Sequence, residues 1–202
     1  LHIGMPKTAS PTLQALLLQN RAQLEARGYA YPVPVPGKIM GNAVPLAQFF
    51  RKGIDSARFE FHNPGVLDFT DAAAFFERTY MAHTCDHLVL SGEALYKSVQ
   101  EYDYHFLFDH FETIKVYLAL RPKMLWLESH FIQRIKTGNY RDDIADLLAD
   151  GTLEEPIEST LNYARTYDYW CNLVGAENVN LHFLGAGFGR IEDQFLKALL
   201  GE

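Results

Sequence analysis

Short, mostly apolar runs alternate along the chain with stretches of helical periodicity. Residues 87–91 and 114–120 have the length and composition of buried strands, and residues 1–4 and 178–184 predict two further strands. Elsewhere, apolar residues recur at spacings of three and four positions. These patterns predict helices over residues 12–27, 46–52, 70–83, 104–112, 122–138, 142–149, 160–174 and 191–200.

Strands that alternate with helices in this way favour a parallel sheet with helices on both faces, because parallel strands need crossover connections. Three prolines within residues 31–37 exclude a helix interior there, and we expect that segment to be extended or looped. The chain has 202 residues, of which 48% are hydrophobic, and no internal repeat. We therefore expect one α/β domain over residues 1–202, with residue 1 at a trimmed boundary because it is not Met.

The charge balance restricts the classes of partner. Eighteen Lys and Arg against 25 Asp and Glu give a net charge of −7, which argues against nucleic acid and anionic lipid as general partners. Any anionic ligand must then be held by a local site. The two cysteines, Cys85 and Cys171, lack metal-ligand spacing and predict neither a disulfide framework nor a metal site. No apolar run reaches the ~20 residues that a membrane-spanning helix needs.

The first candidate site follows the predicted strand at residues 1–4. Residues 4–12 read Gly-Met-Pro-Lys-Thr-Ala-Ser-Pro-Thr and lead directly into a predicted helix. A loop in this position directs backbone N–H groups, hydroxyls and the ammonium of Lys7 toward an anion at the positive end of the helix. The spacing is not that of a Walker A motif. An ordinary strand-to-helix turn with a surface lysine is the alternative.

The second candidate site is Arg121, which immediately follows the predicted strand 114–120. Ligands of parallel α/β sheets bind at the carboxyl ends of the strands, and Arg121 stands at such an end. Ser129 comes eight residues later, two turns along the next predicted helix, so it can join the guanidinium around one phosphate. Alternatively, Arg121 pairs with a carboxylate and Ser129 is a surface residue.

Three segments together carry a resemblance to a known family. The stretches HIGMPKTASPTLQ, LVLSGEAL and VYLALRPKMLWLESHFIQRIKTG resemble the sulfotransferases that use 3′-phosphoadenosine 5′-phosphosulfate (PAPS), especially bacterial members that act on carbohydrates or small hydroxylated molecules. The similarity covers nearly the whole chain in patches. It implies a P-loop NTPase-like three-layer sandwich and transfer of a sulfuryl group from PAPS to a hydroxyl or amine. It also implies a cytoplasmic protein with no metal cofactor.

The resemblance assigns roles to the residues of both candidate sites. The 5′-phosphosulfate would be held by the loop after the first strand, and the 3′-phosphate by Arg121 and Ser129. The loop residues concerned are Lys7, Thr8, Ala9, Ser10, Pro11 and Thr12. Ala9 stands where the family usually has Gly, so we expect it to avoid a positive φ, and Pro11 lacks an N–H that could face the phosphate. A nucleotide-binding relative with impaired catalysis is therefore the alternative function.

Sulfuryl transfer needs a cation at the leaving phosphate and a base at the acceptor. Lys7 is the candidate cation, because charge develops on the leaving oxygens in the transition state. Glu93, two residues beyond the predicted strand 87–91, is the candidate base, although it can equally be a glutamate at a helix N-terminus. His62 and His105 are the other candidates for this role.

A kinase is the remaining alternative. It would need a carboxylate at a strand end to hold Mg²⁺, and the sequence offers none there. The glycine-containing loop 184–190 is read as a turn, or as a segment that closes over the donor phosphate with Arg190. The acceptor, a saccharide or small hydroxylated molecule, is expected to contact residues 31–69 and 139–158.

Overall fold

The central element of the protein is a parallel sheet. The computed structural model describes residues 1–33, 42–43, 76–97, 104–138, 155–185, 187 and 189–201. Strand β4 (Val116–Leu120) lies in the middle of a three-stranded parallel sheet, between β1 (His2–Gly4) and β5 (Val179–Phe183). Leu118 of β4 is in register with Ile3 on one side and Leu181 on the other. The mixed α/β class with a parallel sheet is confirmed.

A second pair of strands extends this sheet. β2 (Tyr29–Ala30) and β3 (His87–Leu88) are parallel to each other, and the chain after β3 continues along β1. There the His2 N–H donates to the carbonyl of Leu90 at 2.7 Å, and a parallel bridge pairs His2 with Ser91. Across the molecule the order is therefore β2, β3, β1, β4, β5. Because these strands are parallel, their carboxyl ends meet at one edge.

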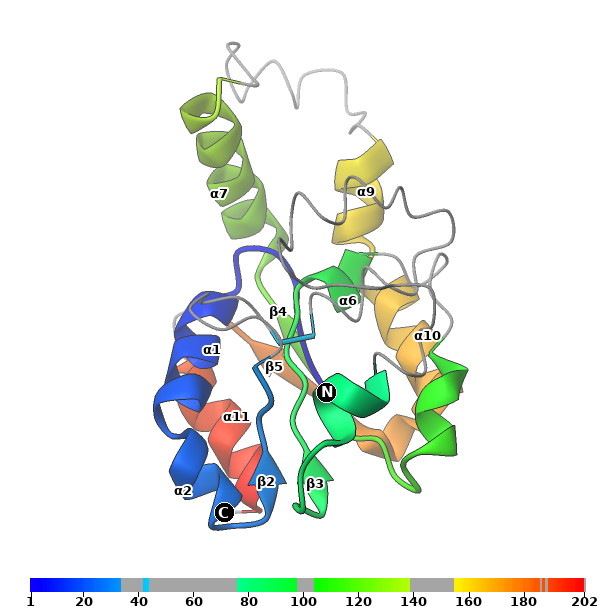
Figure 1. The fold of residues 1–202 in the computed structure, drawn as a ribbon. Helices are drawn as coiled ribbons and strands as arrows, with labels where there is room; N and C mark the ends of the chain where they lie inside the picture. The colour runs from blue at the N-terminus through cyan, green and yellow to red at the C-terminus, as the bar shows by residue number, and fades with distance from the viewer. Residues whose placement is uncertain are drawn as a thin grey trace.

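Helices cover both faces of the sheet (Figure 1). α1, α2 and α11 lie on one face and α6 and α10 on the other, while α7 extends from the carboxyl edge. The helices are α1 (Ser10–Gln19), α2 (Arg21–Glu25), α6 (Ala94–Lys97), α7 (Lys123–Lys136), α9 (Glu155–Leu161), α10 (Tyr163–Val174) and α11 (Ile191–Leu200). A π-helical turn, η1 (Glu77–Met81), and two 3₁₀ turns, η2 (His105–Asp109) and η3 (Ala176–Asn178), complete the described elements.

The alternation of side chains along β4 produces two hydrophobic cores. Tyr117 faces α1 and α11, where it packs with residues that include Leu13, Leu17 and Phe195. Val116, Leu118 and Leu120 face the opposite side. Their core includes Trp126 of α7 and Trp170 of α10, both almost fully buried. A strand that is buried on both faces reads as a nearly continuous apolar run, which is why this strand was the clearest one in the sequence.

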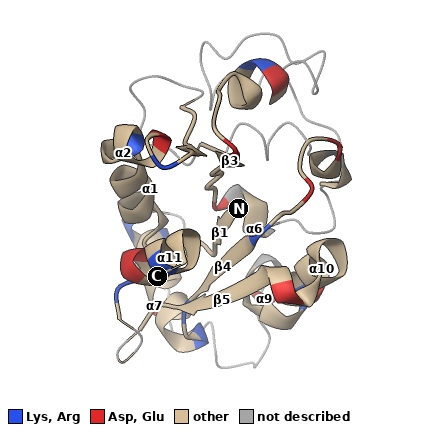
Figure 2. Cartoon of the chain, turned by 90° about the horizontal axis from the view of Figure 1, so that it is seen from below, with Lys and Arg blue, Asp and Glu red and all other residues tan. Residues whose placement is uncertain are grey.

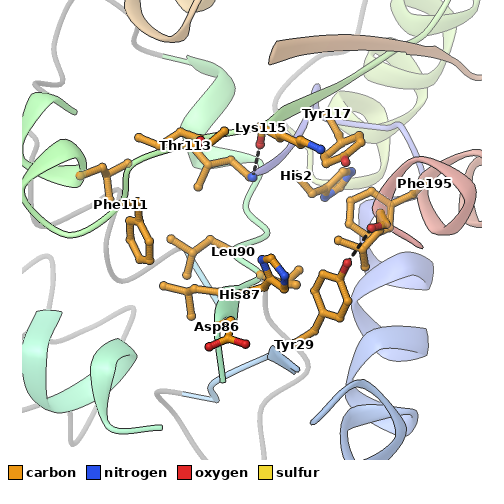
Figure 3. Close-up of a pocket in the computed structure, with 16 residues that line it drawn as sticks. His2, Tyr29, Asp86, His87, Leu90, Phe111, Thr113, Lys115, Tyr117 and Phe195 are labelled. Carbon is orange, nitrogen blue, oxygen red and sulfur yellow. Dashed lines mark hydrogen bonds between the residues drawn. The ribbon is translucent and has the colours of Figure 1, made fainter. Parts of the chain in front are cut away.

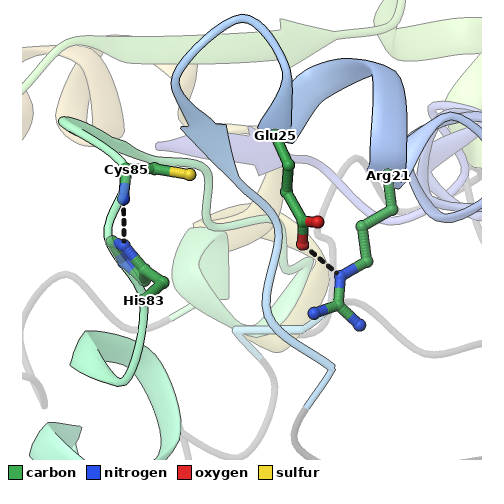
Figure 4. A network of polar contacts seen from close by, with 4 residues as sticks. All are labelled: Arg21, Glu25, His83 and Cys85. Atoms are coloured by element: carbon green, nitrogen blue, oxygen red, sulfur yellow. Dashed lines mark hydrogen bonds and ion pairs between the residues drawn. The ribbon is translucent and has the colours of Figure 1, made fainter.

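Two predicted helices differ from the structure because asparagines interrupt them. The helix expected over residues 12–27 is divided into α1 and α2 at Asn20, whose side-chain amide donates to the carbonyl of Leu16. Arg21 and Glu25 of α2 form an ion pair of 2.9 Å (Figure 4). The helix expected over residues 160–174 is divided at Asn162: residues 160 and 161 end α9, and α10 begins at Tyr163, where the side chain of Asn162 accepts the N–H of Arg165. The periodicity of apolar residues carries no information about such polar side chains, so it could not predict where these helices are divided.

Other boundaries also shift. β3 covers only the first two residues of the strand predicted over 87–91, and a turn in which the Cys85 N–H donates to His83 Nδ1 precedes it (Figure 4). Residues 104–112 contain a 3₁₀ turn rather than an α-helix, and the described end of the predicted helix 70–83 is π-helical. The predicted helices 46–52 and 142–149, and most of the segment 31–37, lie outside the described residues. In the described part of the chain, no helix combines the length and apolarity needed to cross a membrane.

Candidate anion-binding site

The loop after β1 is folded tightly against the first turn of α1. A Cβ on Gly4 would lie only 2.0 Å from Ser10 Oγ and 3.1 Å from Thr8 Oγ1, so a side chain at this position would have to displace the side chain of Ser10. The Met5 N–H donates to the carbonyl of Ala119, which ties the start of the loop to β4. The Thr8 hydroxyl donates to the carbonyl of Met5 at 2.6 Å and is fully buried. Gly4 and Thr8 therefore fix the shape of the loop.

Two loop residues have left-handed backbone conformations. Lys7 has a φ of 71° and Ala9 a φ of 57°, with Thr8 between them at negative φ. The expectation that Ala9 avoids positive φ was wrong: Ala9 occupies the N-cap position of α1 in the left-handed region. The chain must reverse within a few residues to pass from β1 into α1, and this outweighs a cost of about 1 kcal/mol per left-handed residue.

Several backbone N–H groups of the loop make no hydrogen bond to the described residues. Within the described part of the chain, the N–H groups of Lys7, Ala9 and Ser10 donate to no acceptor. Backbones that alternate between left- and right-handed residues form concave sets of N–H groups, called nests, that bind anions. The positive end of α1 begins at the same place. The loop thus has the chemistry of an anion site.

Arg121 lies against this loop. Its Nη1 donates to the carbonyl of Lys7 at 3.1 Å, so the residue after β4 and the loop after β1 are in direct contact. The Tyr163 hydroxyl of α10 donates to the carbonyl of Arg121. The guanidinium is half-buried and keeps further N–H donors beyond the one given to Lys7. The two sites predicted separately from the sequence therefore converge at the carboxyl edge of the sheet.

One face of α7 forms the next wall of the site. The Trp126 indole N–H donates to the carbonyl of Pro6 at 2.7 Å, and Gln133 accepts a hydrogen bond of 2.9 Å from Lys7 Nζ. Ser129 lies three positions after Trp126 and four before Gln133, so the three residues share this face. The Lys7–Gln133 contact was missed in the sequence. The only sequence feature that pointed to Gln133 was its position four residues after Ser129.

The remaining residues predicted for the loop differ in exposure. Ser10 is buried, with its Oγ 3.4 Å from Thr8 Oγ1, so both hydroxyls lie inside the loop. Pro11 and Thr12 are exposed in the first turn of α1. The Thr12 N–H is already bonded to the carbonyl of Ala9. The loop N–H groups and Lys7, rather than the hydroxyls of Thr8 and Ser10, are thus the groups available to a ligand.

The candidate bases are less well defined. Glu93 is half-buried in the turn before α6, beyond the strand segment that pairs with β1. His105 is exposed in η2, and His62 lies outside the described residues. In the loop after β5, Gly187 and Gly189 have positive φ, and Arg190 is mostly exposed beside Glu192. The predicted acceptor regions fall largely outside the described residues.

A cavity of about 360 Å³ opens at the opposite, amino-terminal edge of the sheet (Figure 3). No pattern in the sequence predicted this cavity. Tyr29 and His87 stack there with ring centroids 4.7 Å apart, and His2 and Phe195 line its inner wall. His2 is 2% exposed, and burial lowers its pKa to about 3. Its ring is therefore neutral at pH 7, with Nδ1 hydrogen-bonded to Ser91 Oγ at 2.8 Å.

Charges of both signs are distributed over several elements of the described chain (Figure 2). In that part of the chain, no three His, Cys, Asp or Glu side chains gather as metal ligands would. Comparison with known proteins gave no match: no family model, no curated protein and no solved structure is significantly similar to this chain. The function of the site must therefore be inferred from its own residues and contacts.

Proposed function

We propose that this protein is a PAPS-dependent sulfotransferase with a P-loop NTPase-like fold. The observation that carries the proposal is the hydrogen bond from Arg121 Nη1 to the carbonyl of Lys7, which joins the two phosphate-binding candidates in one site. A donor with phosphates at the 3′ and 5′ positions of one ribose needs cationic groups at two neighbouring places in one site. Arg121 and Lys7 supply them from the ends of adjacent strands.

The topology supports the same proposal. The loop with Lys7 connects a central strand to the first helix, and the strand order β2, β3, β1, β4, β5 places it beside the end of β4. Nucleotides bind at the carboxyl edge of such sheets, where the order of the strands reverses. In this chain the reversal lies between β1 and β4, where Lys7 and Arg121 lie.

The proposed reaction moves one sulfuryl group. The acceptor oxygen forms a bond to sulfur, while the bond from sulfur to the 5′-phosphate oxygen breaks and its electron pair stays on the phosphate. Lys7 and the loop N–H groups stabilise that developing charge. Glu93 takes the acceptor proton. The products are the sulfated acceptor and 3′-phosphoadenosine 5′-phosphate (PAP).

A relative without catalytic activity was the alternative suggested by Ala9 and Pro11. Ala9 adopts the left-handed conformation that Gly would, so its side chain does not prevent the loop from forming. Pro11 occupies the first turn of α1, where its missing N–H leaves those of Lys7, Ala9 and Ser10 in place. Both observations favour an active enzyme over the impaired relative.

Calorimetric titration of the full chain in EDTA tests the proposal. PAP is expected to bind without Mg²⁺, and 5′-AMP about 100-fold more weakly, because it lacks the charged hydrogen bonds to Arg121 and Ser129. Radiolabelled PAPS is then offered with a panel of sugars and phenols, and the enzyme should transfer label to one of them. Equal binding of PAP and 5′-AMP contradicts the nucleotide assignment. Tight binding without transfer to any acceptor favours the impaired relative.

A further inference from the structure

Lys7 reaches across the site to a neutral partner. Its Nζ donates to Gln133 Oε1 at 2.9 Å. Among the described residues, Gln133 is the one hydrogen-bond partner of this side chain. An ammonium has three donors, so two remain for a ligand. Because the amide of Gln133 has no charge, it orients the lysine without neutralising it.

The position of Gln133 is fixed through α7. Trp126, seven residues earlier on the same face, is anchored to the carbonyl of Pro6, next to Lys7 in the loop. The two contacts are separated by about 10 Å along the helix axis, and Ser129 lies between them. α7 therefore holds Lys7 from its far end while Arg121 holds its carbonyl. The long lysine side chain is constrained at both ends.

Resting on the proposed function, we propose that Gln133 is a positioning residue that holds the Lys7 ammonium over the sulfuryl group, and that its neutrality is required. A carboxylate at this position would form an ion pair with Lys7 and repel the anionic donor. A small side chain would release the lysine to rotate away from the leaving oxygen. The first change acts on binding and the second on the rate of transfer.

Three variants of the full chain separate these effects: Gln133→Glu, Gln133→Ala, and Gln23→Glu as the matched control, since Gln23 is exposed on α2 and gains the same charge. PAP and inorganic sulfate are titrated at low and high salt. Gln133→Glu should weaken both by about tenfold at low salt, with a smaller difference at high salt. Gln23→Glu should bind like the wild type. Gln133→Ala should bind PAP within about twofold but hydrolyse PAPS about tenfold more slowly.

The outcomes distinguish the two proposals. If Gln133→Glu binds sulfate and PAP as Gln23→Glu does, or Gln133→Ala keeps the wild-type rate, the role of Gln133 is overturned. If the wild type binds sulfate but not PAP, the sulfotransferase proposal fails, and the sulfate titration of Gln133→Glu still decides whether the neutral partner matters for anion binding. If the wild type binds neither, both proposals fail. Because Gln133 is exposed, we expect the variants and the wild type to have equal melting temperatures. Equal values would exclude a general loss of structure as the cause of the changes in binding or rate.

Discussion

The two edges of the sheet are built by the same strands but differ in chemistry. β4 begins after Lys115, which lines the amino-edge cavity, and ends before Arg121, which contacts the loop of Lys7. At the carboxyl edge, cations are half-buried, held by neutral oxygens, and accompanied by left-handed backbone. At the amino edge, the ring of Phe195 lies edge-on against His2, which burial keeps neutral, and Tyr29 stacks on His87. The carboxyl edge thus keeps Lys7 and Arg121 charged with neutral partners, whereas the amino edge holds one buried histidine in its neutral form.

The largest expected effect comes from removing a cation at each edge in turn. Arg121→Ala should weaken PAP binding about 100-fold, because it removes charged hydrogen bonds to the ligand and the support of the Lys7 carbonyl. Lys115→Ala removes the same charge from the exposed start of β4 and should change PAP binding less than twofold. Calorimetric titration measures both. Similar losses in the two variants would mean that net charge alone, rather than the carboxyl-edge site, attracts the ligand.

Gly4→Ala should be the most destabilising small change at the carboxyl edge. The new Cβ would overlap Ser10 Oγ, and relieving such an overlap costs about 2 kcal/mol in the free energy of unfolding. Urea unfolding measures this loss. Ser10→Ala removes the overlapping oxygen, so the double variant should recover part of the loss relative to the sum of the single variants. Strict additivity of the two changes would mean that Gly4 and Ser10 do not contact each other.

The buried histidine at the amino edge should make the free energy of unfolding depend on pH. Burial lowers the pKa of His2 from 6.5 to about 3, so this ring stays neutral in the folded chain while the unfolded chain takes up a proton below pH 6.5. The contribution of His2 to stability is therefore complete above that pH and falls by about 1.4 kcal/mol per pH unit as the pH decreases toward the folded pKa. Burial also lowers the pKa of His182, which acts in the same direction.

Unfolding free energies measured between pH 7 and 5.5 test this dependence. His2→Asn should reduce the slope by about one proton, because the variant no longer takes up that proton on unfolding. If His2→Asn folds too weakly to measure, His182→Asn in β5 should lower the slope in the same direction, because burial also lowers the pKa of that ring. An unchanged slope in both buried-histidine variants would contradict the effect of burial on these two rings.

The sequence predicted the residues of the carboxyl edge but not the cavity at the amino edge. Apolar runs gave the strands, because a strand buried on both faces has a simple composition, and the strand ends located Lys7 and Arg121. The amino-edge cavity could not be predicted, because Tyr29, His87 and Phe195 come from segments that only the tertiary fold brings together. Gln133 was missed for the same reason. The backbone of the loop was predicted wrongly at Ala9, because side-chain preference was weighed without the geometry of the turn.

Ala9 provides the smallest and most specific test of the strained loop. Its φ of 57° favours glycine, so Ala9→Gly should raise the free energy of unfolding by about 0.5–1 kcal/mol, after allowance for the greater freedom of glycine in the unfolded chain. Ala22→Gly, at an exposed position of α2, should instead lower it by about 1 kcal/mol. Urea unfolding of both variants compares the signs. If both changes destabilise the protein, Ala9 is not held in the left-handed region, and the loop does not form the nest of N–H groups that the proposed anion binding requires.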